Sequence, residues 1–229
     1  MTVDPDPASS TPGRARLSWR SAAFVVLGNL IPIFGVVVLD WNAVQILLLF
    51  WCENVITGVM TLPRILGAQA VEPTRAAGSG EIVIPTTGLG GRTLLALFFI
   101  VHYGIFCLGH GFFTSVLLAD QSADWPALWS GVFAERDFRL AILGMVAVQM
   151  ILLVKDWILP RQWRRSGPRE EMIRPYGRIL ILHMTVIVGA WVAGGAEAPT
   201  AVVLVLCLVK AVAEILALSR RPEPTVAAA

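Results

Sequence analysis

Long apolar stretches are the feature that most constrains this chain. A hydrocarbon core about 30 Å thick is crossed by about 20 helical residues. The 229-residue sequence holds six apolar stretches of this order, at 21–39, 43–62, 93–119, 138–157, 177–195 and 199–218. With 56% hydrophobic and 15% charged residues, the chain is more apolar than an ordinary soluble domain. The sequence therefore predicts an all-α fold, a polytopic membrane bundle of six transmembrane helices.

Arginine placement predicts the orientation of these helices, because cytoplasmic loops are enriched in basic residues. Arginines cluster before the first span and in every second connection: Arg14, Arg16, Arg20, Arg64, Arg75, Arg92, Arg161, Arg164, Arg165, Arg169, Arg174, Arg220 and Arg221. The other connections are short or acidic. We therefore expect both termini in the cytoplasm, a disordered tail at 1–17, a transmembrane domain at 18–219 and a second tail at 220–229.

The net charge and the cysteine spacing limit the partners and sites that we expect for this chain. The net charge is only +2 and the basic residues fall in loops, so we expect the lipid bilayer and no nucleic acid as a partner. Three cysteines, Cys52, Cys107 and Cys207, lie in apolar stretches without the paired spacing of a metal or redox site, so we interpret them as packing residues. The expected location is the inner (plasma) membrane, crossed several times.

Several polar residues interrupt the predicted spans. The second span carries Glu53 and Asn54, and the third carries His102 and His110 on one helix face. We expect both histidines to face the bundle interior, with small residues around them permitting close helix approach: Gly104, Gly109 and Gly111. Further polar residues lie in the first, fifth and sixth spans: Asn29, His183, Lys210 and Glu214. Ionisable groups inside a membrane are costly and are usually functional or paired. Each one therefore needs a partner.

Depth along the helices suggests which of these polar residues lie close together. Counted at 1.5 Å per residue from the cytoplasmic ends, Asn29, Glu53, His102 and Lys210 lie roughly 12 to 14 Å deep and His183 about 9 Å. His110 lies about 12 Å beyond His102, too far to share one ion with it. We therefore predict one cluster of Glu53, His102 and His183. For Lys210, two alternatives remain open: a pair with Glu214 on its own helix or a pair with Glu53 across helices.

Three motifs, "WCENVITG", "HYGIFCLGHGFF" and "ILHMTVIVGA", resemble a family of prokaryotic polytopic membrane proteins known as domain of unknown function 6498. The resemblance covers most of the chain, to about residue 192. Its motif positions here are Glu53, Asn54, His102, Tyr103, Gly104, Phe106, His110, Gly111 and His183. The resemblance implies a helical membrane fold and no established activity.

Three functions fit these residues. Two imidazoles and a carboxylate, His102, His183 and Glu53, match the ligand set of catalytic zinc and of non-haem iron, which could act on a lipid-like substrate. Alternatively, the same residues with His110 could exchange protons in a relay or a proton-coupled carrier. Finally, the polar layer could only fix helix register or bind a partner. In each case Asn29, Asn54, Tyr103, His110 and Lys210 are the expected supporting residues.

Overall fold

The computed structural model describes residues 30–70, 88–118, 124–181, 183–184, 205 and 207–212. Within these ranges the chain is helical, with no residue in a strand. Three helices are long and apolar enough to cross a membrane, and they span Ala43–Gly67, Gly88–Phe113 and Arg136–Ile158. An all-helical fold with apolar spans is therefore confirmed. The predicted number of six spans and the cytoplasmic termini stay predictions.

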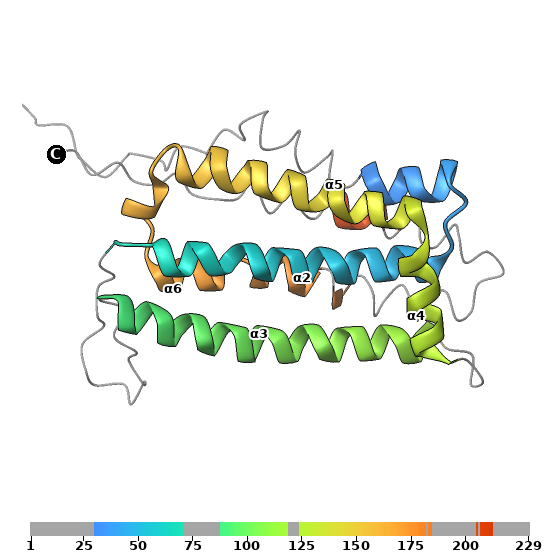
Figure 1. Ribbon diagram of the computed structural model, residues 1–229, viewed down its shortest axis with the longest axis horizontal. Helices are drawn as coiled ribbons and strands as arrows, with labels where there is room; N and C mark the ends of the chain where they lie inside the picture. Colours follow the sequence, from blue (N-terminus) through green and yellow to red (C-terminus); the bar gives the residue numbers. More distant parts are fainter. Residues whose placement is uncertain are drawn as a thin grey trace, which may run out of the picture.

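Three helices, α2 (Ala43–Gly67), α3 (Gly88–Leu118) and α5 (Arg136–Leu153), form one row, as Figure 1 shows. The short helix α4 (Trp125–Ala134) joins the far ends of α3 and α5. Helix α5 continues through a π-helical turn, η2 (Val154–Ile158), and a 3-10 turn, η3 (Gln162–Arg164), before α6 (Pro168–Ile173). Further helical residues lie at 30–38, 176–181, 183–184, 205 and 207–212.

Helix starts follow local capping chemistry. Asn42 and Gln45 form a reciprocal capping box at the start of α2, which satisfies backbone N–H groups that the first helical turn cannot pair. Asp124 caps α4, whose second residue is proline. Span length predicts only a connection here, between the third and fourth spans. The correction follows from the cap and the proline, which start a helix too short to be found by span length.

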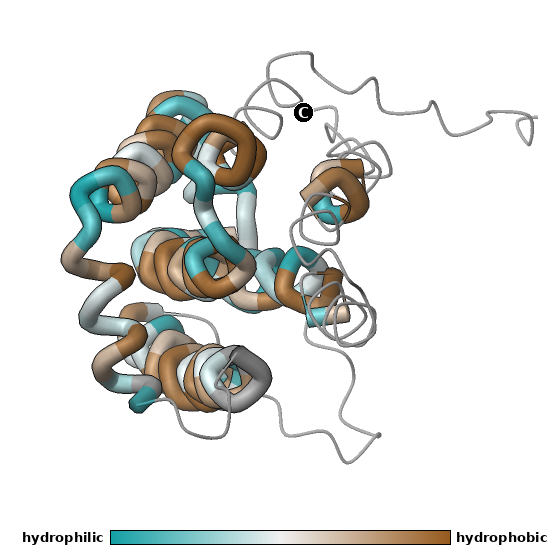
Figure 2. Tube along the Cα trace, turned by 90° about the vertical axis from the view of Figure 1, so that its right-hand side faces the viewer, coloured by the Kyte–Doolittle hydropathy of each residue, from teal (hydrophilic) through white to brown (hydrophobic). Residues whose placement is uncertain are grey.

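Burial divides the bundle into an apolar core and an apolar outside. One core cluster joins the first half of α2 to α5 and α4, and a second joins the later half of α2 to α3 and to Met172, Tyr176 and Ile179. Large side chains of α3 are exposed instead, among them Leu97, Val101, Ile105, Leu108 and Phe112. Figure 2, which looks along the helices, shows apolar residues on the outer surfaces as well as inside. Such a surface suits hydrocarbon rather than water.

Helical structure begins earlier in the chain than residue 177, where the fifth span was predicted to start. Helix α6 already packs against α2 and α3, and the chain turns helical again at Tyr176 after an interruption at Arg174 and Pro175. Proline removes a backbone donor and breaks an α-helix. The chain is therefore helical on both sides of this proline, and the polar first piece, α6, kept the earlier start out of a hydropathy pattern.

Close packing of α2 against α3 depends on Gly111. A methyl group there would lie 2.7 Å from Nε1 of Trp51, whose indole N–H donates to the Cys107 carbonyl at 2.9 Å. Gly104 and Gly109, which we also expected to permit close helix approach, have no atom within 4 Å of such a methyl. Only Gly111 of these three glycines is a contact position.

We expect Gly111→Ala to destabilise the protein by about 1–3 kcal/mol, the usual cost of overpacking, because Trp51 must leave its hydrogen bond. Gly109→Ala, two residues away on the same helix, is the matched control and should cost nothing. Thermal unfolding in detergent, followed by tryptophan fluorescence, measures both variants. Equal stability of the two variants would contradict the assigned packing.

Candidate functional site: a polar seam between helices

Polar side chains on the helical stretch that begins at Tyr176 meet α2 and α3 at three levels. Tyr176 contacts His102, Arg178 contacts Glu53, and His183 contacts His110. Residue numbers on α3 and on this stretch increase together, so the two helices run parallel. We call this set, with Lys210, the polar seam.

Glu53 occupies the middle level and forms two ion pairs. Its carboxylate accepts from the Arg178 guanidinium, and its second oxygen lies 2.9 Å from the Lys210 ammonium. The Lys210 residue is only 2% exposed, and its ammonium also lies 5.1 Å from the Phe50 ring centre. The cross-helix alternative for Lys210 is thus confirmed. Glu53 ties α2 to two later helices.

His110, which is buried, and His183, which is partly buried, form the next level. The Nδ1 atoms of His110 and His183 lie 3.2 Å apart, and their ring centres are 5.5 Å apart. His110 is 2% exposed, and its other nitrogen, Nε2, is buried without a hydrogen-bond partner among the described residues. A hydrogen bond between two Nδ1 atoms needs one ring to donate and the other to accept. The contact therefore couples the protonation of the two rings.

His102 lies at the outer edge of the seam. Its Nδ1 atom is 2.8 Å from the Tyr176 hydroxyl, and its ring stacks on Phe98 with 5.5 Å between centres. The residue is nevertheless exposed on the surface of α3. Of the two histidines expected to face the interior, His110 does so, whereas His102 is exposed but keeps a protein partner.

Tyr103 and Asn54 support the seam by joining α2 to α3. The Tyr103 hydroxyl donates to the Asn54 carbonyl at 2.8 Å, and both residues are buried. One turn farther along α3, the Trp51 indole donates to the Cys107 carbonyl. These bonds hold His102 and His110 at set levels relative to Glu53. Asn29 and Glu214, also expected near the site, lie outside the described residues.

The structure does not gather Glu53, His102 and His183 around one ion. In the described part of the chain, no three His, Cys, Asp or Glu side chains are placed to hold a metal. The predicted cluster was wrong about the depth of His183 in the bundle. Tyr176 is level with His102, so residue 176 already lies inside the bundle, and His183 reaches the deeper level of His110. Counting from residue 177 placed His183 too shallow.

Two seam residues, Tyr176 and Arg178, were missed by sequence reasoning. The sequence does hold a signal for them. Tyr176 and His183 are seven residues apart, and His102 and His110 are eight apart, so two parallel helices carry polar residues at matching steps. The interruption at Pro175 obscured this, because it placed Tyr176 and Arg178 at the presumed water boundary.

No curated protein and no solved structure shows a significant match to this chain. One family model matches, and it covers residues 11–228, nearly the whole sequence. The match includes all the seam residues and agrees with the resemblance carried by the glutamate and histidine motifs. The chain belongs to the family of unknown function DUF6498.

Proposed function

We propose that this protein moves protons within the membrane, with the His110–His183 pair as the transfer step. The observation that supports this most directly is the 3.2 Å contact between two imidazole nitrogens on different helices. An imidazole can accept a proton at one nitrogen and release one from the other. Two such rings in contact can pass a proton from helix to helix.

The buried Nε2 atom of His110 favours this function over a purely structural one. Among the residues that the structure describes, this atom has no hydrogen-bond partner. A buried polar atom left so costs about 1–3 kcal/mol, and a contact that only fixed helix register would gain nothing from it. A relay needs both nitrogens of a ring, one to receive a proton and the other to release one. His110 presents Nδ1 to His183 and keeps Nε2 for a second proton partner.

The ion pairs of Glu53 have a positioning role in this proposal. Arg178 and His183 lie on the same helical stretch, five residues apart, so the bond from Arg178 to Glu53 sets the height of His183 against α2. The Tyr103 and Trp51 hydrogen bonds in turn hold α2 against α3, which carries His110. Because a salt bridge in a low-dielectric interior is strongly orienting, this stretch resists sliding. In this proposal the ion pairs of Glu53 hold the helices in place, and the neighbouring His110–His183 contact passes the proton.

We further infer a multi-pass location in the plasma membrane with the arginine-rich end in the cytoplasm. Arg92 donates to the Leu66 carbonyl, and the backbone at Gln69 and Ala70 bonds to Trp163 and Ser166. The basic connections expected on one side therefore meet at one end of the bundle. This arrangement supports the orientation that the loop arginines predict.

Reconstitution into liposomes tests the proposal. With an imposed pH gradient and valinomycin to balance charge, an internal pH dye should report faster proton entry in liposomes holding the protein than in protein-free liposomes. The gradient should be applied in both directions, because insertion can be mixed. Rates equal to those of protein-free liposomes in both directions would overturn proton movement as the function.

A further inference from the structure

The chain between α5 and α6 forms a compact turn, Leu159–Arg165, which we call the arginine turn. Arg161 adopts a left-handed backbone conformation with φ of 53°, and Arg164 N donates to the Arg161 carbonyl at 3.0 Å. Arg165 N donates to the Gln162 carbonyl at 2.8 Å. These bonds gather three arginines within one turn of backbone. Arg161, Arg164 and Arg165 are all exposed.

Acidic residues do not neutralise this turn from within. The turn itself contains no Asp or Glu. Glu170 and Glu171, which follow on α6, both pair with Arg174 at 3.6 and 3.1 Å. Asp156 precedes the turn, beside Lys155 on η2. The arginine turn is therefore a locally cationic surface.

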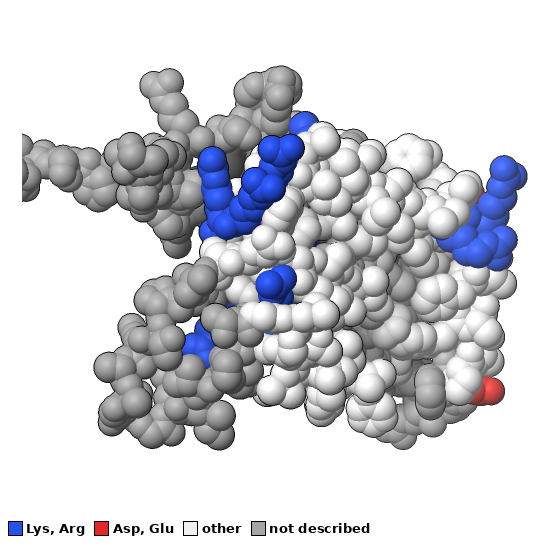
Figure 3. Space-filling model, turned by 60° about the vertical axis from the view of Figure 1, so that its left-hand side comes forward, with Lys and Arg blue, Asp and Glu red and all other residues white. Residues whose placement is uncertain are grey.

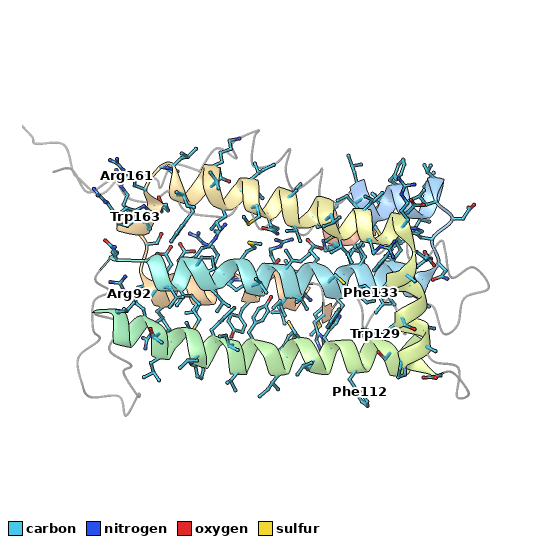
Figure 4. The ribbon with its side chains drawn as sticks, in the orientation of Figure 1. Arg92, Phe112, Trp129, Phe133, Arg161 and Trp163 are labelled. Carbon is cyan, nitrogen blue, oxygen red and sulfur yellow. The ribbon has the colours of Figure 1, made fainter. Side chains whose placement is uncertain are left out.

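Apolar side chains adjoin these charges. Leu159 is 71% exposed and Ile158 is 45% exposed, directly before the arginines. The Arg164 guanidinium lies over the Trp163 ring at 4.7 Å. Figure 4 shows Arg161, Trp163 and Arg92 at one end of the bundle, and Figure 3 shows Lys and Arg side chains gathered over that end. Tryptophan beside arginine at a helix end is typical of the membrane interface.

The opposite end differs in charge. Arg136 and Arg139 lie there between and beside the acidic residues Glu135 and Asp137. The Arg139 guanidinium already donates to the carbonyls of Phe133 and Ala134. This end therefore provides a mixed surface, which makes it an internal control for the arginine turn.

We propose that the arginine turn binds the phosphate groups of anionic phospholipids. Guanidinium groups bind phosphate oxygens bidentately, and adjacent exposed apolar side chains can contact the lipid chains. A lipid carries both parts in one molecule, whereas a free phosphate ion would use only the charges. This inference does not depend on proton movement, since the turn is separate from the polar seam.

Native mass spectrometry of the detergent-purified full chain, titrated with a short-chain phosphatidylglycerol, tests the proposal. Phosphatidylcholine and inorganic phosphate serve as separate titrants. We expect tight phosphatidylglycerol binding to the wild type. Each lost arginine should weaken it about fivefold, so the double variant Arg161→Gln/Arg165→Gln should weaken it by about 25-fold. Arg136→Gln, at the other end, should bind as the wild type does.

Each alternative outcome has a distinct meaning. Equal losses in Arg136→Gln and in the single Arg161→Gln variant would show unspecific charge attraction and overturn the site. Phosphate competing as strongly as phosphatidylglycerol would show an anion site that ignores the lipid, which also contradicts the proposal. Should the double variant fail to fold, the single variants Arg161→Gln and Arg165→Gln still measure the loss of about fivefold that each arginine should cause.

Discussion

Replacing His110 with phenylalanine should lower proton flux in liposomes by about 100-fold or more, because positioned proton transfer commonly contributes factors of this size. Phenylalanine keeps a planar ring in the buried position but cannot carry a proton. The same liposome assay measures the rate, and thermal unfolding in detergent confirms that the variant is folded. His110→Gln, which retains hydrogen bonding without proton exchange, should lose flux as well.

His183→Phe should show the same loss, and the double variant should lose no more than either single one. The effects of replacing two residues that form one transfer step do not add, since removing either residue already removes the step. His102→Phe is the matched control on α3. It removes an exposed imidazole bonded to Tyr176 and should leave flux unchanged. A large flux loss in His102→Phe with normal flux in His110→Phe would refute the assigned pair.

Replacing Glu53 with glutamine should destabilise the protein by about 3–5 kcal/mol, the usual cost of removing one partner of a buried ion pair. The Lys210 side chain is 3% exposed, and the variant removes the carboxylate that its ammonium faces at 2.9 Å. For a chain of this size the melting temperature should fall by about 6–20 °C. Tryptophan fluorescence during heating in detergent measures the change.

Two further variants test the origin of this loss. Glu53→Gln/Lys210→Met removes both charges and should recover much of the stability, because an apolar replacement of a buried pair is often neutral. Glu170→Gln changes a glutamate whose side chain is 60% exposed and whose distance to Arg174 is 3.6 Å, so it should cost at most about 1 kcal/mol. Equal losses in Glu53→Gln and Glu170→Gln would contradict a buried ionic level.

Helical segments were predictable wherever chain-local rules decide them. The second span was expected from residue 43, and α2 does begin at Ala43, after the Asn42 cap. The third span was expected at 93–119, and α3 occupies Gly88–Leu118. Hydropathy over a window locates such helices because each one must cover its own backbone with apolar side chains. Short helical pieces such as α4 and α6 fall below this window.

Partner choice in the seam was only partly predictable. The need of Glu53 and Lys210 for partners follows from their cost in a membrane, and one of the two alternatives for Lys210 was the observed ion pair. The pairing of His183 with His110 rather than His102 depends on how far one helix is shifted along another. A shift of a few residues, about 1.5 Å each, exchanges one partner for the next.

By itself, the sequence determined that this protein is helical, that its helices are apolar enough for a membrane, and that a few costly polar residues must be paired. These properties depend on each segment's own composition. Only the tertiary structure decided that Arg178 and Lys210 both form ion pairs with Glu53, and that two histidines 73 residues apart share a hydrogen bond. The physical reason is that helix register is set by packing between segments, through contacts such as Gly111 with Trp51 and Tyr103 with Asn54.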